Sequence, residues 1–248
     1  MSNSHQLLRG KKILVIGGSS GVGRSVAAAT LAHGASVVIS SSSQDRVATT
    51  VKTLRQNIQG RSDVSVVGYA FNIKDTSALT KFLTENGPFD HLVITAGDPP
   101  GNTNFPTQPI DENIKAQFDS RYWAVVTAAE HIHKHNLIHP GGSITLTLGT
   151  AQTRPLPGWG LINGVMGAVE SSVRGLAVDL KPLRINAIEL GLVNTELYDK
   201  TPPELRDSIF KSYEDKVLVE HVGTADEVAE AYIFAMKIIT VDGGGTIV

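Results

Sequence analysis

A glycine-rich turn between an apolar run and an amphipathic stretch constrains this chain more than any other feature. The apolar run ends at Ile16, the turn spans Gly17–Gly23, and a stretch of helical period follows to His33. This order predicts a strand, a tight turn and a helix. Gly17 would permit the turn, Gly21 would let a pyrophosphate approach the backbone, and Gly23 would let the helix pack closely. The N-terminus of the helix would offer free N–H groups to that phosphate.

Apolar runs alternate with stretches of helical period along the whole chain. We expect strands at Lys12–Ile16, Ser36–Ser40, Val64–Tyr69, His91–Thr95, Ser143–Leu148, Arg184–Leu190 and Ile238–Val241. We expect helices at Val22–His33, Gln44–Ile58, Thr76–Asn86, Asp111–Asn136, Gly160–Leu180 and Ala225–Met236. Alternation of this kind predicts βαβ units. The fold class is therefore α/β: one domain over residues 1–248, with a doubly wound parallel sheet of about seven strands covered on both faces.

Composition excludes several classes of function. The formal net charge is −2, so no basic excess favours nucleic acid or an anionic membrane surface. The chain has no cysteine, which excludes disulfides and thiolate catalysis. No run approaches the roughly 18 apolar residues that span a bilayer, and Met1–Arg9 lacks the apolar core of a signal peptide. We expect a cytoplasmic protein that acts on a small molecule.

Three connections are expected to form the substrate side of the domain. They are residues 98–109, 149–159 and 191–220, each of which follows a predicted strand. Ligands bind at the carboxyl edge of open α/β sheets, so these loops would overhang the site. One junction is unusual: the helix ending near Lys237 runs directly into the strand beginning at Ile238, where a connection of 2–6 residues is usual. We expect distortion there.

The spacing of the glycine turn, Gly17-x-x-x-Gly21-x-Gly23, resembles the T-G-x-x-x-G-x-G motif of the short-chain dehydrogenases/reductases, with Ile16 in place of the threonine. Further segments resemble the family over nearly the whole chain: Thr95-Ala96-Gly97, Gly175–Leu180 followed by Arg184–Ala187, Gly191–Thr195, and Val241–Gly244. The resemblance implies a Rossmann-type sheet, a nicotinamide cofactor, and a homodimer or homotetramer.

The end of the second predicted strand narrows the cofactor. NAD-specific relatives carry an acid there that takes the ribose hydroxyls, whereas this chain has a serine run and no acid before Asp45. Serine hydroxyls, with Arg46 and Arg24 close in sequence, can donate to a 2′-phosphate, although a plain polar turn is the alternative. We expect NADP(H). The expected cofactor contacts are Gly17, Ser19, Ser20, Gly21, Val22, Gly23, Ser40, Ser41, Ser42, Arg46, Asn72, Ile73, Ala96, Gly97, Arg121, Val193 and Thr195.

The residues that carry the family's chemistry are replaced in this chain. Alignment on Gly167–Leu180 puts Met166 at the family's lysine position, Ile162 at its tyrosine position and Gly149 at its serine position. Arg121 stands where the family has an asparagine. An apolar side chain cannot donate a proton, and a positioned acid is typically worth 10²–10⁴-fold in rate. Ordinary ketone reduction is therefore expected to be slow or absent.

Three residues are the candidates for catalysis: Arg121, Glu189 and Trp159. Arg121 and Trp159 resemble an arginine and a tryptophan used by fungal alkaloid-pathway members of the family that lack the tyrosine and lysine. An acid expected three residues before that tryptophan is here Leu156. Glu189 would place a carboxylate near the nicotinamide, where it could stabilise a cation. Structural alternatives remain. Glu189 could form an ion pair with Arg121 or another base, Arg121 could contact the cofactor, and Trp159 could be a pocket wall or a core residue.

Three functions follow from these residues. The first is an atypical NADP-dependent reductase of a C=N or C=O group in a bulky secondary-metabolite intermediate. Hydride addition to an iminium yields a neutral amine and needs no acid. The second is a non-redox, cyclase-type enzyme that retains the cofactor fold, and the third is a non-catalytic cofactor-binding protein. No metal site is expected, because His131 and His135 have only two-ligand spacing on an exposed helix end.

Overall fold

A six-stranded parallel sheet forms the centre of the protein. The computed structural model describes residues 7–97, 105–107 and 109–236. The strands are β1 (Lys12–Ile16), β2 (Ser36–Ser41), β3 (Val66–Ala70), β4 (Phe89–Ile94), β5 (Ile138–Gly149) and β6 (Arg184–Leu190), in the order β3-β2-β1-β4-β5-β6. This is the Rossmann-type α/β fold that the sequence predicts. The seventh predicted strand, Ile238–Val241, and the junction before it lie outside the described residues.

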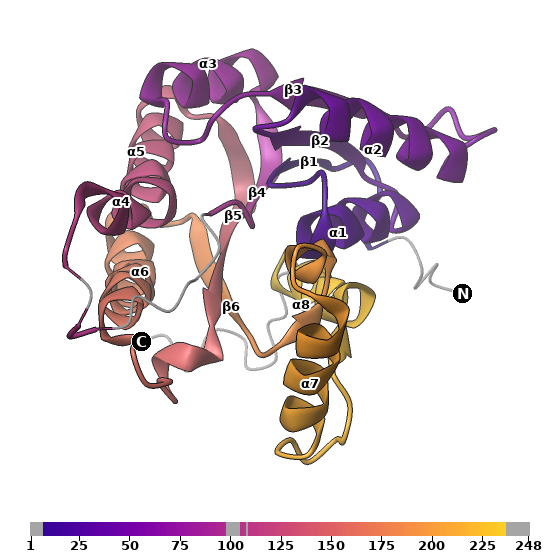
Figure 1. The fold of residues 1–248 in the computed structure, drawn as a ribbon. Coiled ribbons are helices and arrows are strands. Elements are labelled where there is room, and N and C mark those ends of the chain that lie inside the picture. The colour runs from indigo at the N-terminus through magenta and orange to yellow at the C-terminus, as the bar shows by residue number, and fades with distance from the viewer. Residues whose placement is uncertain (1–6, 98–104, 108, 237–248) are drawn as a thin grey trace, which may run out of the picture.

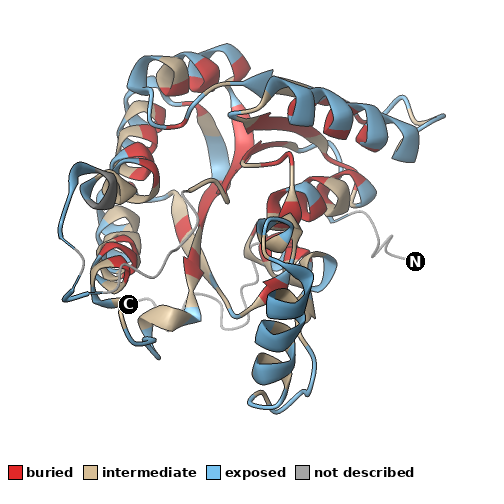
Figure 2. Cartoon of the chain, in the orientation of Figure 1, coloured by how far each residue is buried: buried red, intermediate tan, exposed pale blue. Residues whose placement is uncertain are grey.

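The sheet is covered on both faces (Figure 1). One layer comprises α1 (Gly21–Ala32), α2 (Gln44–Asn57) and α8 (Ala225–Met236), and the other comprises α3 (Thr76–Asn86), α5 (Ala124–His135) and α6 (Gly160–Asp179). Side chains alternate between the layers: Leu14 and Ile16 pack toward α3, α5 and α6, whereas Ile13 and Val15 pack toward α1, α2 and α8. The central strand β1 is therefore apolar on both faces, and buried residues gather on the sheet and the inner sides of the helices (Figure 2).

The strand order reverses direction between β1 and β4, which are hydrogen-bonded neighbours. The connection after β1 leads to α1 on one face, and the connection after β4 leads toward α5 on the other. A crevice at the carboxyl edge forms where an open α/β sheet switches direction in this way. The glycine turn and Thr95-Ala96-Gly97 meet at this point, because the N–H groups of Thr95 and Ala96 both donate to the Ile16 carbonyl, at 2.9 and 3.0 Å.

The predicted helix over Asp111–Asn136 is wrong as a single element. The chain instead forms α4 (Glu112–Lys115), a π-helical turn η1 (Asp119–Trp123) and then α5. The hydrogen bond from the Ala124 N–H to the Asp119 carbonyl spans five residues, which winds one extra residue into the turn. Periodicity did not reveal this, because a single π-turn shifts the apolar face without ending it.

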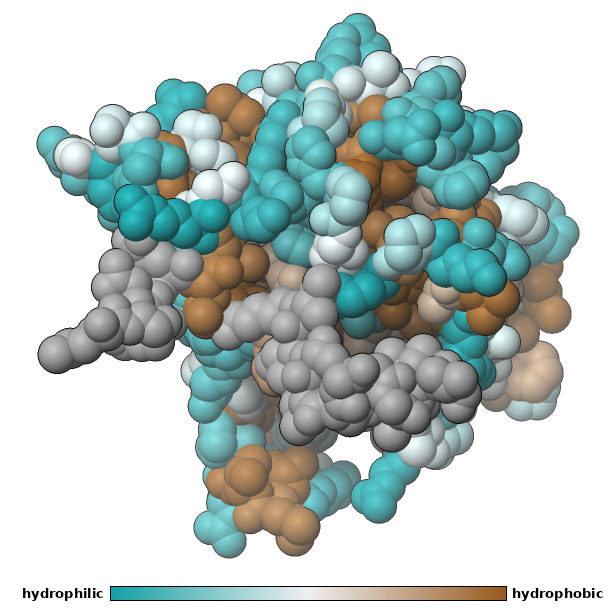
Figure 3. Space-filling view, turned by 180° about the vertical axis from the view of Figure 1, so that it is seen from behind, coloured by the Kyte–Doolittle hydropathy of each residue, from teal (hydrophilic) through white to brown (hydrophobic). Residues whose placement is uncertain are grey.

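The predicted loop at 191–220 also contains regular structure. It holds the short strand β7 (Val193–Asn194), the 3₁₀ turn η3 (Glu196–Tyr198) and the helix α7 (Pro203–Glu214), and β7 pairs with β8 (Gly223–Thr224). No residue of α7 is buried, and the helix projects past α8 at the lower end of the molecule (Figure 1). Apolar surface is visible at the lower end of the opposite face (Figure 3). Leu205, Ile209 and Leu218 are among the exposed apolar residues of this segment.

Candidate functional site

The glycine turn is a backbone cradle that side chains cannot enter. Gly17 has φ of +97°, and a Cβ there would lie 2.5 Å from the Thr95 Oγ1. A Cβ on Gly23 would lie 2.2 Å from the Gly17 carbonyl oxygen. These contacts require glycine at both positions, one for its positive φ and both for the close approach. Ser19 is buried and its carbonyl accepts from Thr50 Oγ1 at 3.0 Å, which holds the turn against α2.

The first turn of α1 borders this cradle. Ser20 is the N-cap residue of α1, but its side chain makes no capping hydrogen bond. Gly21 begins the helix with φ of +49°, and Val22, the next residue of α1, packs against the core. The turn thus brings together the glycines and serines that the sequence assigned to cofactor binding, with backbone N–H groups at the helix N-terminus.

The serine run lies at the carboxyl end of β2, beside the turn. Ser40 is fully buried, and its carbonyl accepts from the Gly17 and Gly18 N–H groups at 2.8 and 3.1 Å. Its hydroxyl therefore does not line the surface, in contrast to our expectation for a cofactor contact. Ser41 is partly exposed and Ser42 is exposed, as is Arg46 in the first turn of α2. These three side chains can reach a ligand at this edge.

The residues expected on the adenine side follow β3. Asn72 is exposed and its Oδ1 accepts from the Lys74 N–H at 3.0 Å, whereas Ile73 is buried in the core. Ile73 therefore positions the turn by packing, and only its backbone is available to a ligand. Ala96 is partly buried at the end of β4, next to the glycine turn.

Arg121 stands over the end of β4. It comes from the π-turn η1, and its side chain packs on Gly97, where an added Cβ would lie 2.9 Å from the guanidinium Cζ. Together with Ala96, Leu146 and Thr147 it lines a small pocket at the carboxyl edge of β4 and β5. The extra residue of the π-turn thus places a cationic side chain beside the switch point of the sheet.

The three positions at which the family has serine, tyrosine and lysine differ in how much space surrounds them. Gly149 ends β5, and a Cβ there would meet nothing closer than the Leu190 carbonyl oxygen at 3.9 Å. Ile162 and Met166 lie one turn apart on α6 and are both buried in the apolar core. The described part of the chain thus has space for a serine side chain but apolar packing where the acid and the amine would stand.

Glu189 and Trp159 border the carboxyl edge of the sheet, Glu189 from the end of β6 and Trp159 from the start of α6. Glu189 is exposed near the end of β6, in register with Leu148. Its carboxylate forms no ion pair or hydrogen bond with any described residue, so the alternative of an ion pair with Arg121 is wrong. Trp159 is the N-cap residue of α6 and packs against the core, which agrees with a wall of the site.

One residue of this site was missed from the sequence. Glu196, in η3, accepts a hydrogen bond from the Gly21 N–H at 2.8 Å through Oε2 and pairs with the Arg24 guanidinium through Oε1. Partial burial alone would raise the pKa of Glu196, but hydrogen bonds from its own and the Gly21 amide, with the Arg24 charge, outweigh this and lower it. The available signal was an acid directly after Thr195, which the sequence analysis already names as a cofactor contact.

Val193 and Thr195 lie on the segment that carries Glu196. Val193 is buried in β7, and the Thr195 Oγ1 accepts from the Leu197 N–H at 3.4 Å. A Cβ on Gly21 would lie 3.2 Å from the Thr195 Cβ, so this segment contacts the N-terminus of α1 directly.

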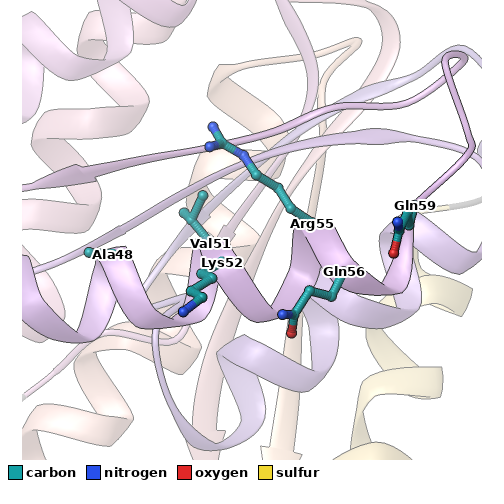
Figure 4. A pocket seen from close by; sticks show the side chains of 6 residues that line it. All are labelled: Ala48, Val51, Lys52, Arg55, Gln56 and Gln59. Carbon is teal, nitrogen blue, oxygen red and sulfur yellow. The ribbon is translucent and has the colours of Figure 1, made fainter.

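A further surface hollow lies along α2 (Figure 4). Its lining includes Lys52, Arg55 and Gln56, but Arg55 turns back to donate to the Val66 carbonyl. Residues of α2 together with Gln59 line the hollow, and none of them belongs to the glycine turn. Within the described ranges, no three His, Asp or Glu side chains gather to hold a metal ion, and no helix is long and apolar enough to cross a membrane.

The parallel sheet, its switch point and the glycine cradle define a Rossmann-type dinucleotide-binding protein. A family model described as an SDR-like Rossmann domain matches residues 5–247. This chain belongs to the short-chain dehydrogenase/reductase family.

Relatives and solved structures agree with this assignment. The short-chain dehydrogenase/reductase malC of Malbranchea aurantiaca is 33% identical over 94% of this chain and 91% of its own length. A structure described as MalC Reductase/Diels-Alderase from the same organism matches with a TM-score of 0.85 and 31% identity, over 93% of this chain and 92% of that one. A small-chain dehydrogenase in complex with NADPH matches with a TM-score of 0.72 and 27% identity, over 96% of this chain and 99% of that one.

Proposed function

We propose that this protein is an NADP-dependent reductase that transfers hydride to a cationic or strongly polarised C=N group in a bulky apolar substrate. The observation that carries the proposal is the burial of Ile162 and Met166 in the core at the positions where the family has its acid and its lysine. A reaction that leaves an alkoxide needs a proton at that point, whereas reduction of an iminium does not.

The cradle supports binding of the cofactor pyrophosphate. Gly17 and Gly23 leave the backbone bare, and the Gly21 N–H already holds a carboxylate, so this position favours an anion. Ser41, Ser42 and Arg46 would take the 2′-phosphate that separates NADPH from NADH. When bound, the cofactor supplies the hydride.

The remaining residues would orient the substrate and stabilise its charge. Arg121 packs over Gly97 beside the pocket and would hold the cofactor or an anionic part of the substrate. Glu189 has an exposed carboxylate at the same edge and would stabilise a substrate cation. Trp159 would form an apolar wall that excludes water.

The test compares cofactors and substrates. NADPH should raise the melting temperature more than NADH, because at equal concentration the ligand that binds more tightly stabilises the folded state more. Oxidation of NADPH should then be fast with cyclic iminium ions and slow with ketones of similar size. Equal stabilisation by both cofactors would contradict the NADP preference, and turnover confined to ketones would contradict acid-free reduction.

A non-redox cyclase is the second candidate, and one finding favours it. The MalC structure, which this chain resembles at 31% identity, is described as a Reductase/Diels-Alderase. Arg121 and Trp159 would then position a reactive intermediate, and rate would come from orientation. Product formation without consumption of NADPH would favour the cyclase, and cofactor binding without any turnover would favour a non-catalytic protein.

We also propose that the protein forms a homodimer or homotetramer through the outer face of α6. Cβ atoms added at Gly164, Gly167 and Gly175 would meet no described atom within 4 Å, so this face would allow close approach of a second helix. Light scattering on the purified protein would test this directly, and a monomer at micromolar concentration would contradict it.

A further inference from the structure

Glu196 places an anion where a dinucleotide would place its phosphates. Its Oε2 lies 2.8 Å from the Gly21 nitrogen, at the first turn of a twelve-residue helix, and its Oε1 pairs with the Arg24 guanidinium. The N-terminus of a helix and a guanidinium both bind phosphate in proteins. The carboxylate therefore already satisfies the interactions that a pyrophosphate at this cradle would make.

The contact is held by the segment around it. Thr195 lies against the Gly21 backbone, with its Cβ 3.2 Å from the position that a Cβ on Gly21 would take. The same segment is anchored through the β7–β8 pair and through Arg206, which donates to the Asn194 Oδ1 at 2.9 Å. A carboxylate on a fixed segment is an intramolecular competitor at high effective concentration.

Helix α7 follows this contact and is otherwise held by a few surface contacts, among them the hydrogen bond from Arg206 to Asn194. None of its residues is buried. Its described contacts include the Tyr198–Phe210 ring pair, with centroids 5.3 Å apart, and Tyr213, whose hydroxyl lies 2.2 Å from the position of a Cβ on Gly191. Because the contact between Glu196 and α1 precedes a helix with no buried residue, release of Glu196 would loosen the 195–216 segment.

We propose that Glu196 is an internal latch that occupies the pyrophosphate position and must leave before the cofactor binds. The inference rests on the cofactor site proposed above. Displacement exchanges one anion for another on the Gly21 N–H and Arg24, and it unties the segment that carries α7. Cofactor binding and opening of this segment are therefore coupled, and removal of the Glu196 charge strengthens cofactor binding.

The test compares Glu196→Gln and Glu196→Ala with Glu204→Gln. Glu204 is an exposed acid in the first turn of α7 and forms no ion pair with a described residue, so its substitution changes the charge equally without touching α1. The dissociation constant for NADPH is measured by titration. We expect it to fall roughly tenfold in both Glu196 variants, within the 5- to 150-fold range of such couplings, and to stay unchanged in Glu204→Gln.

Limited trypsin digestion without cofactor gives a second readout, independent of dinucleotide binding. Cleavage after Lys200 and Arg206 should be several-fold faster in the Glu196 variants than in the wild type or Glu204→Gln. Unchanged NADPH affinity in both Glu196 variants of a protein that binds NADPH would overturn the latch and leave the cofactor site standing. If neither the wild type nor any variant binds a nicotinamide dinucleotide, the proposed cofactor site is wrong. Equal cleavage rates in the wild type and the Glu196 variants would then also contradict the proposal that Glu196 restrains this segment.

Discussion

Gly23 shows how one residue without a side chain fixes the approach of a helix to a sheet. A Cβ at this position would lie 2.2 Å from the Gly17 carbonyl oxygen and 2.5 Å from the Thr95 Oγ1. Neither neighbour can yield easily, because the Gly17 oxygen is backbone and Thr95 is held by hydrogen bonds to Ile16. The cradle and the first turn of α1 therefore exist only with glycine here.

We predict that Gly23→Ala lowers the free energy of unfolding by about 3 kcal/mol, the upper end of the cost of overpacking. The matched control is Gly223→Ala in β8, where a Cβ meets no described atom within 4 Å. That change should stabilise the protein by about 0.5–1 kcal/mol, since glycine loses more conformational entropy on folding than alanine does. Urea denaturation measures both, and equal effects of the two changes would contradict the close packing at Gly23.

At the scale of the element, the buried side of α6 contains the positions at which the family has its tyrosine and lysine. Apolar core residues occupy these positions here. Ile162, Val165, Met166 and Val169 form its buried side and pack in one core cluster with the strands. The face that carries an acid and an amine in relatives is here part of the core. Restoring polar groups therefore disturbs stability before it can restore chemistry.

We predict that Met166→Lys lowers the free energy of unfolding by on the order of 3 kcal/mol, because the ammonium group would enter an apolar core. Met166→Leu, which keeps the volume, should cost less than about 1.5 kcal/mol. Gly149→Ser should cost little, since a Cβ there has room. Chemical denaturation of the three variants checks this, and a Met166→Lys variant as stable as Met166→Leu would show that the amine reaches solvent.

Elements with a strong apolar period were predictable from the sequence, and those set by single turns or tertiary contacts were not. The strand β1, the helix α1 and the glycine turn follow from local pattern alone, because each buries its own apolar residues. The π-turn at Asp119–Trp123 and the helix α7 were missed. The π-turn shifts the apolar face without ending it, and α7 has no buried residue.

The residues of the candidate site also divide into those that the sequence predicts and those that it does not. Backbone features such as Gly17 and Gly23 were predictable, because only glycine has the required freedom. The contact of Glu196 with Gly21 joins residues 175 positions apart, and no local pattern encodes it. The serine run also does not show which of its side chains is buried, because neighbouring residues of a strand face opposite sides. In the structure Ser40 is the buried one.

At the scale of the whole molecule, the edge of the sheet opposite the candidate site carries a buried polar group that links stability to pH. His91, at the amino end of β4, is 4% exposed and its Nδ1 lies 2.9 Å from the Ser143 Oγ on β5. Burial lowers the pKa of His91 from 6.5 to about 4, the nearby Asp90 opposes this, and Arg184 and Lys11 lower it further. In the folded protein this imidazole is therefore neutral between pH about 4 and pH 6.5.

The unfolded chain binds a proton at His91 below pH about 6.5, whereas the folded chain binds it only below about 4. Stability is therefore fully present above pH 6.5 and is lost as the pH falls toward 4, by on the order of 3 kcal/mol. We predict that His91→Gln flattens the dependence of unfolding free energy on pH in this window, while His139→Gln, at an exposed position, leaves it unchanged. Urea denaturation at pH 7, 5.5 and 4 measures the difference between variant and wild type. Parallel curves for wild type and His91→Gln would contradict a neutral buried imidazole, because a group that titrates alike in both states cannot change the slope.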